Sequence, residues 1–221
     1  MTTAIRRDAC KLVEKQVPNE FLRELVFSLA PAYRDAHERA FADYERSEAV
    51  NVLPFMRRAN VEKAFRTAAV KHGLKASTEQ SSGGWNYTLV QAGDLLITQA
   101  AAPNEYHVVH QALYRLTLAK NNWMLDRQLH MYLCEEPQKV DSFYAIFLHG
   151  KQEDDPSKPA FAHLVFPDVN CRNYVEYINL LSLCDIKGNG WLNTIPEEAI
   201  PDLSQPQLLP GIHRNKNGAE K

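Results

Sequence analysis

The apolar positions of residues 143–166 form two short runs on either side of a polar loop. The first run reads Phe143-Tyr-Ala-Ile-Phe-Leu-His149 and the second reads Phe161-Ala-His-Leu-Val-Phe166. Both runs are apolar at positions of either parity, whereas a strand with one wet face alternates apolar and polar side chains. Glycine, prolines and charges mark residues 150–159 as the connection between them. The pattern predicts paired strands in the middle of a sheet that is covered on both faces.

Helical periodicity dominates the first third of the chain. We expect a short helix over residues 4–17, a second helix capped by Asn19, and a third over 53–72 with Pro54 in its first turn. Pro31 is expected to kink the second helix or to start a new one. Beyond it, apolar side chains recur at helical spacing and form one stripe: Tyr33, Ala36, His37, Ala40, Phe41 and Tyr44.

The next residues mix strand and helix patterns. Strands are expected over 74–79, 85–91 and 95–101, with a tight turn at Ala92-Gly93-Asp94. A helix is expected to begin at Pro103-Asn104, and residues 126–141 fit neither period. A last helix is expected over 169–184, capped by Asp168 or Asn170.

These elements predict an α/β or α+β fold with a mixed sheet of about five strands. Residues 1–50 would form a helical segment packed on a core of residues 51–185. Residues 186–221 are expected to form an extended C-terminal arm that pairs with another protein or with a second copy of the chain. This arm carries four spaced prolines: Pro196, Pro201, Pro206 and Pro210.

Composition sets few limits on function. The 221 residues are 45% hydrophobic and 24% charged, which is ordinary for a globular chain that can bury a core. The formal charge of −2 favours neither nucleic acid nor membranes, and no apolar run approaches the roughly 20 residues that cross a bilayer. The four cysteines form no Cys-x-x-Cys pair, so we expect buried free thiols in the cytosol: Cys10, Cys134, Cys171 and Cys184.

One segment is locally basic. Residues 56–75 hold six basic side chains and the single acidic residue Glu62. The flexible hairpin that follows, residues 80–95, carries Trp85, and helix and hairpin together resemble in outline a recognition helix and its wing. Basic side chains that solubilise a helix are the simpler interpretation. The candidate nucleic-acid-binding residues are Arg57, Arg58, Lys63, Arg66, Lys71, Lys75 and Trp85.

A metal-dependent nuclease is the main alternative. The expected order of helix, three strands, helix and strand resembles the layout of the restriction-endonuclease-like core. That chemistry needs an Asp on one strand and Glu-x-Lys on the next. Asp94 is present, but the following strand reads Thr98-Gln99-Ala100-Ala101. The resemblance therefore implies a degenerate relative.

No cofactor or metal site is predicted. His107 and His110 lie three residues apart beside Glu105, but no third zinc ligand is evident. Whether His149 and His163 join them depends on the fold. Residues 153–155 are acidic without the calcium-loop pattern, and phosphate-loop motifs are absent from the sequence.

The sequence thus predicts a non-enzymatic cytosolic interaction or regulatory protein. DNA is the first expected partner, bound through the 56–75 helix and the 80–95 hairpin, and membranes are not expected as partners. The alternative is a nuclease or other phosphoesterase, and no catalytic residue is assigned to it.

Overall fold

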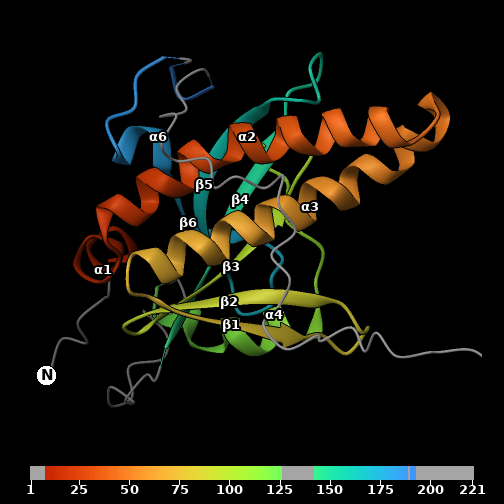
Figure 1. Ribbon diagram of the computed structural model, residues 1–221. Coiled ribbons are helices and arrows are strands. Elements are labelled where there is room, and N and C mark those ends of the chain that lie inside the picture. Colours follow the sequence, from red (N-terminus) through yellow and green to blue (C-terminus); the bar gives the residue numbers. More distant parts are fainter. Residues whose placement is uncertain (1–7, 126–141, 189, 193–221) are drawn as a thin grey trace, which may run out of the picture.

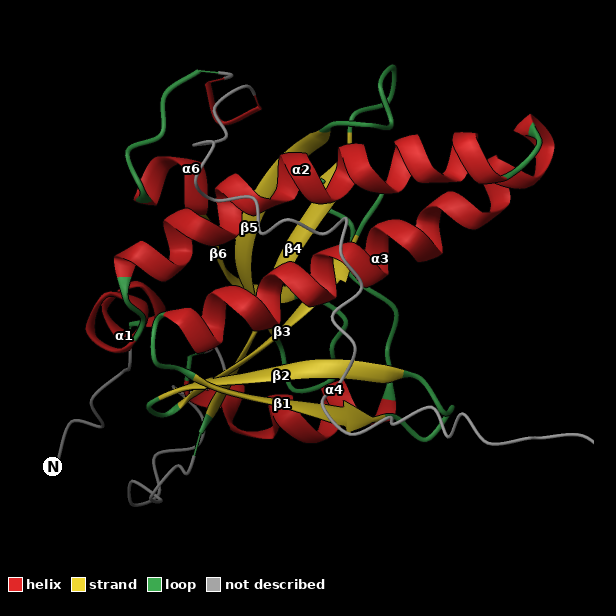
Figure 2. Ribbon diagram, viewed as in Figure 1, coloured by secondary structure: helices red, strands yellow, loops and turns green. Residues whose placement is uncertain are grey.

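A single six-stranded sheet with helices on both faces forms the body of the protein in the computed structural model (Figures 1 and 2). The structure describes residues 8–125, 142–188 and 190–192. The α+β class expected from the sequence is confirmed, with six strands instead of about five. The helical elements are α1 (Ala9–Gln16), α2 (Asn19–Asp43), α3 (Arg46–Lys71), α4 (Leu113–Leu118), α6 (Leu180–Leu183) and the 3₁₀ turns η1 (Ala119–Met124) and η2 (Gly190–Leu192). The strands are β1 (Lys75–Gln80), β2 (Asn86–Ala92), β3 (Leu95–Ala101), β4 (Phe143–Lys151), β5 (Pro159–Pro167) and β6 (Tyr174–Asn179).

The strands lie in the sheet in the order in which they occur in the chain. All neighbours are antiparallel except β3 and β4, which run parallel, with Leu95 opposite Phe143 and Ala101 opposite His149. A parallel pair needs a crossover connection. Part of this crossover is α4 and η1, and residues 126–141 lie outside the described residues.

The central position expected for the two apolar runs is confirmed. Eight of the nine residues of β4 are buried, and so are eight of the nine of β5. One face of β4 contributes Phe143, Ala145 and Phe147 to a core shared with α1, α2 and α3. Its other face packs against residues 102–119 and a second apolar cluster. Side chains of both parities are therefore apolar because both faces are covered.

Helices α2 and α3 form a long antiparallel pair across one face of the sheet (Figure 1). Pro31 does not start a new helix, since α2 continues from Asn19 to Asp43. The helix α3 begins at Arg46 and not near residue 53, so Pro54 lies inside it. An interior proline costs a helix about 3 kcal/mol. Burial of apolar residues on both sides of each proline offsets this cost.

The helix expected over residues 169–184 is wrong. The Asp168 carboxylate accepts hydrogen bonds from the backbone N–H groups of Asn170 and Arg172, at 3.1 and 2.8 Å, and so closes a turn instead of capping a helix. Strand β6 follows and pairs with the open edge of β5, and only α6 is helical. The apolar spacing fits a helix, but the exposed backbone groups of β5 needed a partner strand.

The helix expected from Pro103-Asn104 begins only at Leu113. Residues 102–112 form no helix or strand and lie at the carboxyl ends of β3 and β4. Residues 193–221 of the expected arm lie outside the described residues, so pairing of copies through it stays a prediction. No helix among the described residues has the length and apolarity that a membrane span requires.

Candidate functional site

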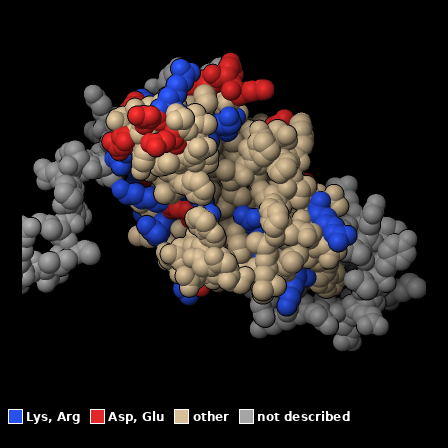
Figure 3. Space-filling view, turned by 90° about the vertical axis from the view of Figure 1, so that its right-hand side faces the viewer, with Lys and Arg blue, Asp and Glu red and all other residues tan. Residues whose placement is uncertain are grey.

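A groove of about 860 Å³ opens beside the carboxyl end of β3. Its walls are the first half of α3, the hairpin tip 81–87 and the segment 103–115. In Figure 3, which faces this side of the molecule, the middle of the surface is hollowed and largely uncharged, single basic groups border it, and most of the visible acidic atoms lie toward the top. Clefts at the carboxyl ends of parallel strands are common ligand sites in open sheets.

Two pairs of stacked aromatic rings line the groove. Phe55 of α3 stacks on Trp85 with ring centres 6.1 Å apart and planes 14° apart. Tyr87 stacks on Tyr114 at 4.1 Å and 18°. Phe55 and Trp85 remain 59% and 55% exposed, which is unusual for rings of this size. The groove therefore presents flat apolar faces to whatever enters it.

A guanidinium group lies over one ring of each pair. The Arg58 Cζ atom is 5.3 Å from the centre of the Trp85 ring, and the Arg115 Cζ atom is 5.2 Å from that of Tyr114. The Arg115 Nη1 donates to the carbonyl of His110, while its buried Nε has no protein partner. These contacts place positive charge next to each aromatic face.

The hairpin tip holds Trp85 in place through backbone bonds. The Ser81 N–H donates to the Trp85 carbonyl at 2.9 Å, and the Trp85 N–H donates to Ser81 Oγ at 3.2 Å. Gly84 takes a φ of +80°, which only glycine adopts without strain. Arg58 Nη2 donates to the carbonyl of Asn86 at 3.1 Å and ties the hairpin to α3.

The floor of the groove carries Glu62 and Gln99. The Glu62 Oε1 atom accepts a hydrogen bond from Gln99 Nε2 at 2.9 Å, and its Oε2 atom accepts one from the Thr88 N–H at 3.0 Å. Two strands thereby hold one carboxylate that α3 supplies. Glu62 is half-buried and its position is fixed from two sides.

A series of buried hydrogen bonds continues from Gln99 into the core. The Gln99 Oε1 atom lies 2.9 Å from His149 Nε2, and His149 Nδ1 lies 2.7 Å from the Tyr33 hydroxyl. Because Gln99 Nε2 already donates to Glu62, its Oε1 must accept from His149, and His149 Nδ1 then accepts from Tyr33. Burial and, next, the charge of Arg57 lower the pKa of His149 to about 3, so the ring is neutral.

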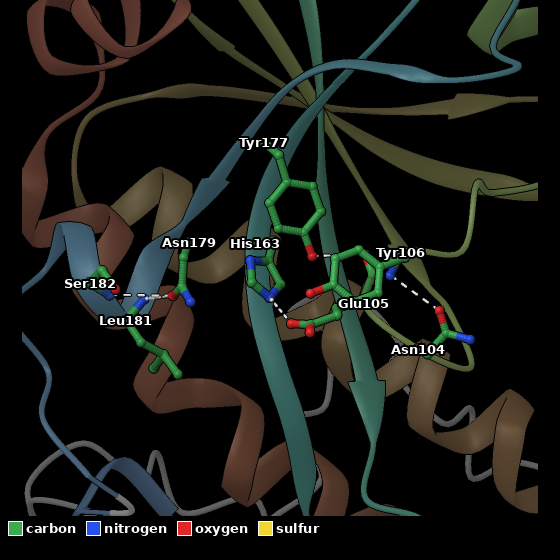
Figure 4. A network of polar contacts seen from close by, with 8 residues as sticks. All are labelled: Asn104, Glu105, Tyr106, His163, Tyr177, Asn179, Leu181 and Ser182. Carbon is green, nitrogen blue, oxygen red and sulfur yellow. Dashed lines mark hydrogen bonds and ion pairs between the residues drawn. The ribbon is translucent and has the colours of Figure 1, made fainter.

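The wall formed by residues 103–112 is fixed to β5 and β6 (Figure 4). The Tyr177 hydroxyl donates to the carbonyl of Glu105 at 2.7 Å, and Glu105 Oε2 lies 3.4 Å from His163 Nε2. The Val109 N–H donates to the Tyr174 hydroxyl, which itself donates to the carbonyl of His107. A segment without helix or strand thus has a defined position.

The basic residues expected to bind nucleic acid are distributed over different surroundings. Arg58 and Trp85 meet in the groove. Arg57 is only 8% exposed, donates to the carbonyl of Pro156 and lies over the Tyr33 ring. The others do not line the groove and are exposed: Lys63, Arg66 (3.4 Å from Thr78 Oγ1), Lys71 (2.9 Å from Glu24) and Lys75.

The histidines and Asp94 do not converge. His107 and His110 line the groove, whereas His149 and His163 are buried on opposite faces of the sheet. Asp94 lies in the β2–β3 turn beside Gln16, five residues or roughly 17 Å along the strand from Gln99. Within residues 8–125, 142–188 and 190–192, no three His, Cys, Asp or Glu side chains are grouped to hold a metal ion.

The protein is therefore an α+β protein with a groove lined by stacked aromatic rings and arginines. No known protein family, curated protein or solved structure matches the chain.

Most of the groove residues are not apparent from the sequence. Phe55, Gln99, Tyr114 and Arg115 carry no motif, and they come from three separate parts of the chain. One signal was present in the sequence. Arg58 and Glu62 are four residues apart and so lie on one face of α3, the face that meets the hairpin.

Proposed function

We propose that the protein is a non-enzymatic binding module that holds single-stranded nucleic acid in the groove. The observation that carries the proposal is the pair of stacked aromatic clusters, each with an arginine beside it. Proteins bind single strands by stacking bases on aromatic rings and by holding the phosphates with cationic groups. The groove supplies both kinds of group in one place.

Unpaired bases suit this surface better than a duplex does. A ring in a groove stacks on a base only if the base is not already stacked inside a helix. Trp85 and Phe55 present more than half of their surface to solvent, so a base can reach them without rearrangement of the core. The sequence predicted DNA bound through the 56–75 helix and the 80–95 hairpin. The groove between these elements favours a single strand over a duplex.

The arrangement of charge supports an anion at the rim of the groove. Arg58 and Arg115 stand at the two aromatic clusters, and His107 and His110 lie along the same wall. Glu62 lies at the floor and would repel a phosphate there. A strand would therefore place its bases inward and its phosphates along the rim.

The test is binding of a fluorescently labelled ten-nucleotide single strand, followed by anisotropy at low and moderate salt. Trp85→Ala should weaken binding by about 5- to 150-fold, because stacking contributes about 1–3 kcal/mol per base. Arg58→Ala should weaken binding and reduce the salt dependence by a slope of about 0.7, the value for one phosphate contact.

Matched variants outside the groove serve as controls. Phe41→Ala removes an exposed ring of α2, and Lys71→Ala removes a basic residue at the far end of α3. Both should bind as the unaltered protein does. Undetectable binding of DNA and RNA single strands at low salt, or stronger binding of a duplex, would reject the proposal.

The hydrolase alternative is tested in the same samples. Cleavage of plasmid DNA, RNA or a small phosphoester with Mg²⁺, Mn²⁺ or Zn²⁺ would favour it, and loss of cleavage in Glu62→Gln would place it in the groove. The non-enzymatic binding module is preferred because Glu62 is the one carboxylate among the described residues that line the groove. Cys171 and Cys184 are buried free thiols as expected, whereas the free thiol of Cys10 is exposed; free thiols support a reducing compartment such as the cytosol.

A further inference from the structure

We propose that Glu62 selects guanine among the bases of the bound strand. The inference rests on the proposed function and adds a base preference to it. It follows from the hydrogen-bonding capacity of one fixed carboxylate in the floor of the groove.

The Glu62 carboxylate has acceptor capacity left. An ionised carboxylate has about four lone-pair sites on its two oxygens. Gln99 Nε2 occupies one site on Oε1 and the Thr88 N–H occupies one on Oε2. Each oxygen therefore keeps one site, and Glu62 lines the groove where a ligand would lie.

The surrounding groups leave the remaining Glu62 lone pairs free to accept hydrogen bonds. Gln99 cannot turn its amide around, because its Oε1 would then face the Glu62 oxygen, and two acceptors cannot form a hydrogen bond. Among the described residues, no Lys or Arg forms an ion pair with Glu62, so no cation takes up the open sites. The two Glu62 oxygens can therefore accept hydrogen bonds from two adjacent donors of a ligand.

Guanine is the base that offers this pair. Its Watson–Crick edge carries the N1–H and N2–H₂ donors side by side. Adenine and cytosine place a ring acceptor next to their amine, and thymine and uracil place carbonyl oxygens on both sides of their single N–H. Any of these four would bring an acceptor against the carboxylate, which costs affinity because a desolvated acceptor is left unpaired.

The position of the Trp85 and Phe55 rings is consistent with a base contact at Glu62. Arg58 and Glu62 are one helical turn apart on the same face of α3, and Arg58 lies over Trp85. A base stacked on the Trp85 and Phe55 side can therefore turn its edge toward Glu62. The phosphate would then lie on the Arg58 side, away from the carboxylate.

The experiment compares five nine-nucleotide strands that differ only in the central base of a thymine run: guanine, inosine, adenine, cytosine or thymine. The guanine strand should bind about 5- to 100-fold more tightly than the thymine strand, as expected of a bidentate base contact. Inosine lacks the N2 amine and should fall between guanine and thymine. This comparison uses the unaltered protein, so it does not depend on how a variant folds.

Glu62→Gln should reduce the guanine-to-thymine ratio to within about twofold, because an amide offers one acceptor and one donor. Glu48→Gln, an exposed position in the first turn of the same helix, should keep the full ratio. Equal binding of all five strands, or a guanine preference that survives in Glu62→Gln, would overturn the inference and leave the proposed function standing. Failure of every strand to bind would overturn the proposed function itself.

Discussion

His149 shows how one buried side chain couples the core to the groove. Its side chain is 0% exposed and uses both ring nitrogens, one toward Tyr33 and one toward Gln99. A neutral imidazole has one donor and one acceptor, and this arrangement satisfies both. Burial and the nearby charge of Arg57 lower the pKa of His149 and so favour this neutral form.

The buried imidazole predicts a loss of stability in mild acid. The pKa of His149 lies at about 3 in the folded protein, below the usual value of 6.5. Between these values the unfolded chain takes up a proton that the folded protein does not, so the free energy of unfolding falls as the pH is lowered below 6.5. This residue alone contributes up to about 1.4 kcal/mol per pH unit. Urea unfolding at pH 7.5 and at steps between 6.5 and 5 measures the slope.

His149→Gln is the control for this effect. A glutamine can still donate and accept in the core but does not titrate, so the slope between pH 6.5 and 5 should become smaller. Burial also lowers the pKa of His163 and gives a smaller contribution of the same sign. An unchanged slope in His149→Gln would contradict the assignment.

At the scale of the elements, Gly150 is a position in β4 where a side chain does not fit. It lies where the register of β4 and β5 shifts, and the neighbouring His149 carbonyl accepts a hydrogen bond from the Ala102 N–H at 2.8 Å. A Cβ atom at Gly150 would lie 2.5 Å from the Ala102 carbonyl oxygen and against the Phe161 ring. The absence of a side chain there lets the segment after β3 approach the sheet.

Gly150→Ala should therefore destabilise the protein by about 1–3 kcal/mol, as expected of an overpacked core. Gly83→Ala is the matched control, since its Cβ would meet nothing closer than 3.8 Å, and its effect should stay within about 0.5 kcal/mol. Chemical unfolding of both variants under identical conditions provides the comparison. Equal stability of the two variants would contradict the close approach of Ala102 and Phe161 to Gly150.

The elements also show where sequence patterns fail. The β3 range was predicted correctly, and β4 and β5 were expected in the right place because their apolar runs are compact and bounded by turn residues. Strand β6 was mistaken for a helix because Cys171, Tyr174, Val175 and Ile178 fit a 3.6-residue period. The spacing of apolar residues carries no information about the open edge of β5. Pairing with that edge is what makes residues 174–179 a strand.

At the scale of the whole molecule, the groove exists only because three distant segments meet. Helix α3, the hairpin tip and residues 103–115 are separated in the chain and joined by bonds such as Arg58 to Asn86. Their proximity depends on the antiparallel β1–β3 hairpins and on the anchoring of Glu105 and Val109 to β6. A ligand bound in the groove should therefore stabilise all three segments together.

Hydrogen–deuterium exchange with a saturating single strand tests this. Backbone amides of residues 81–87 and 103–115 should exchange more slowly, as should those at the start of α3, because the ligand binds only when the segments are assembled. Amides of α1 and β6 serve as internal controls and should change little. Protection confined to α3 would indicate a different surface, such as a duplex lying on the helix.

The sequence by itself determined the fold class, the central buried strands and the helical N-terminal third, because periodicity and turn residues are local properties. It also showed an excess of basic residues in 56–75, yet not which of them share a surface. The tertiary structure decided that Arg57 enters the core while Arg58 reaches Trp85, and that Glu62 meets Gln99. Neighbouring positions on a helix point in different directions, and only the packing of α3 on the sheet selects which of them faces the groove.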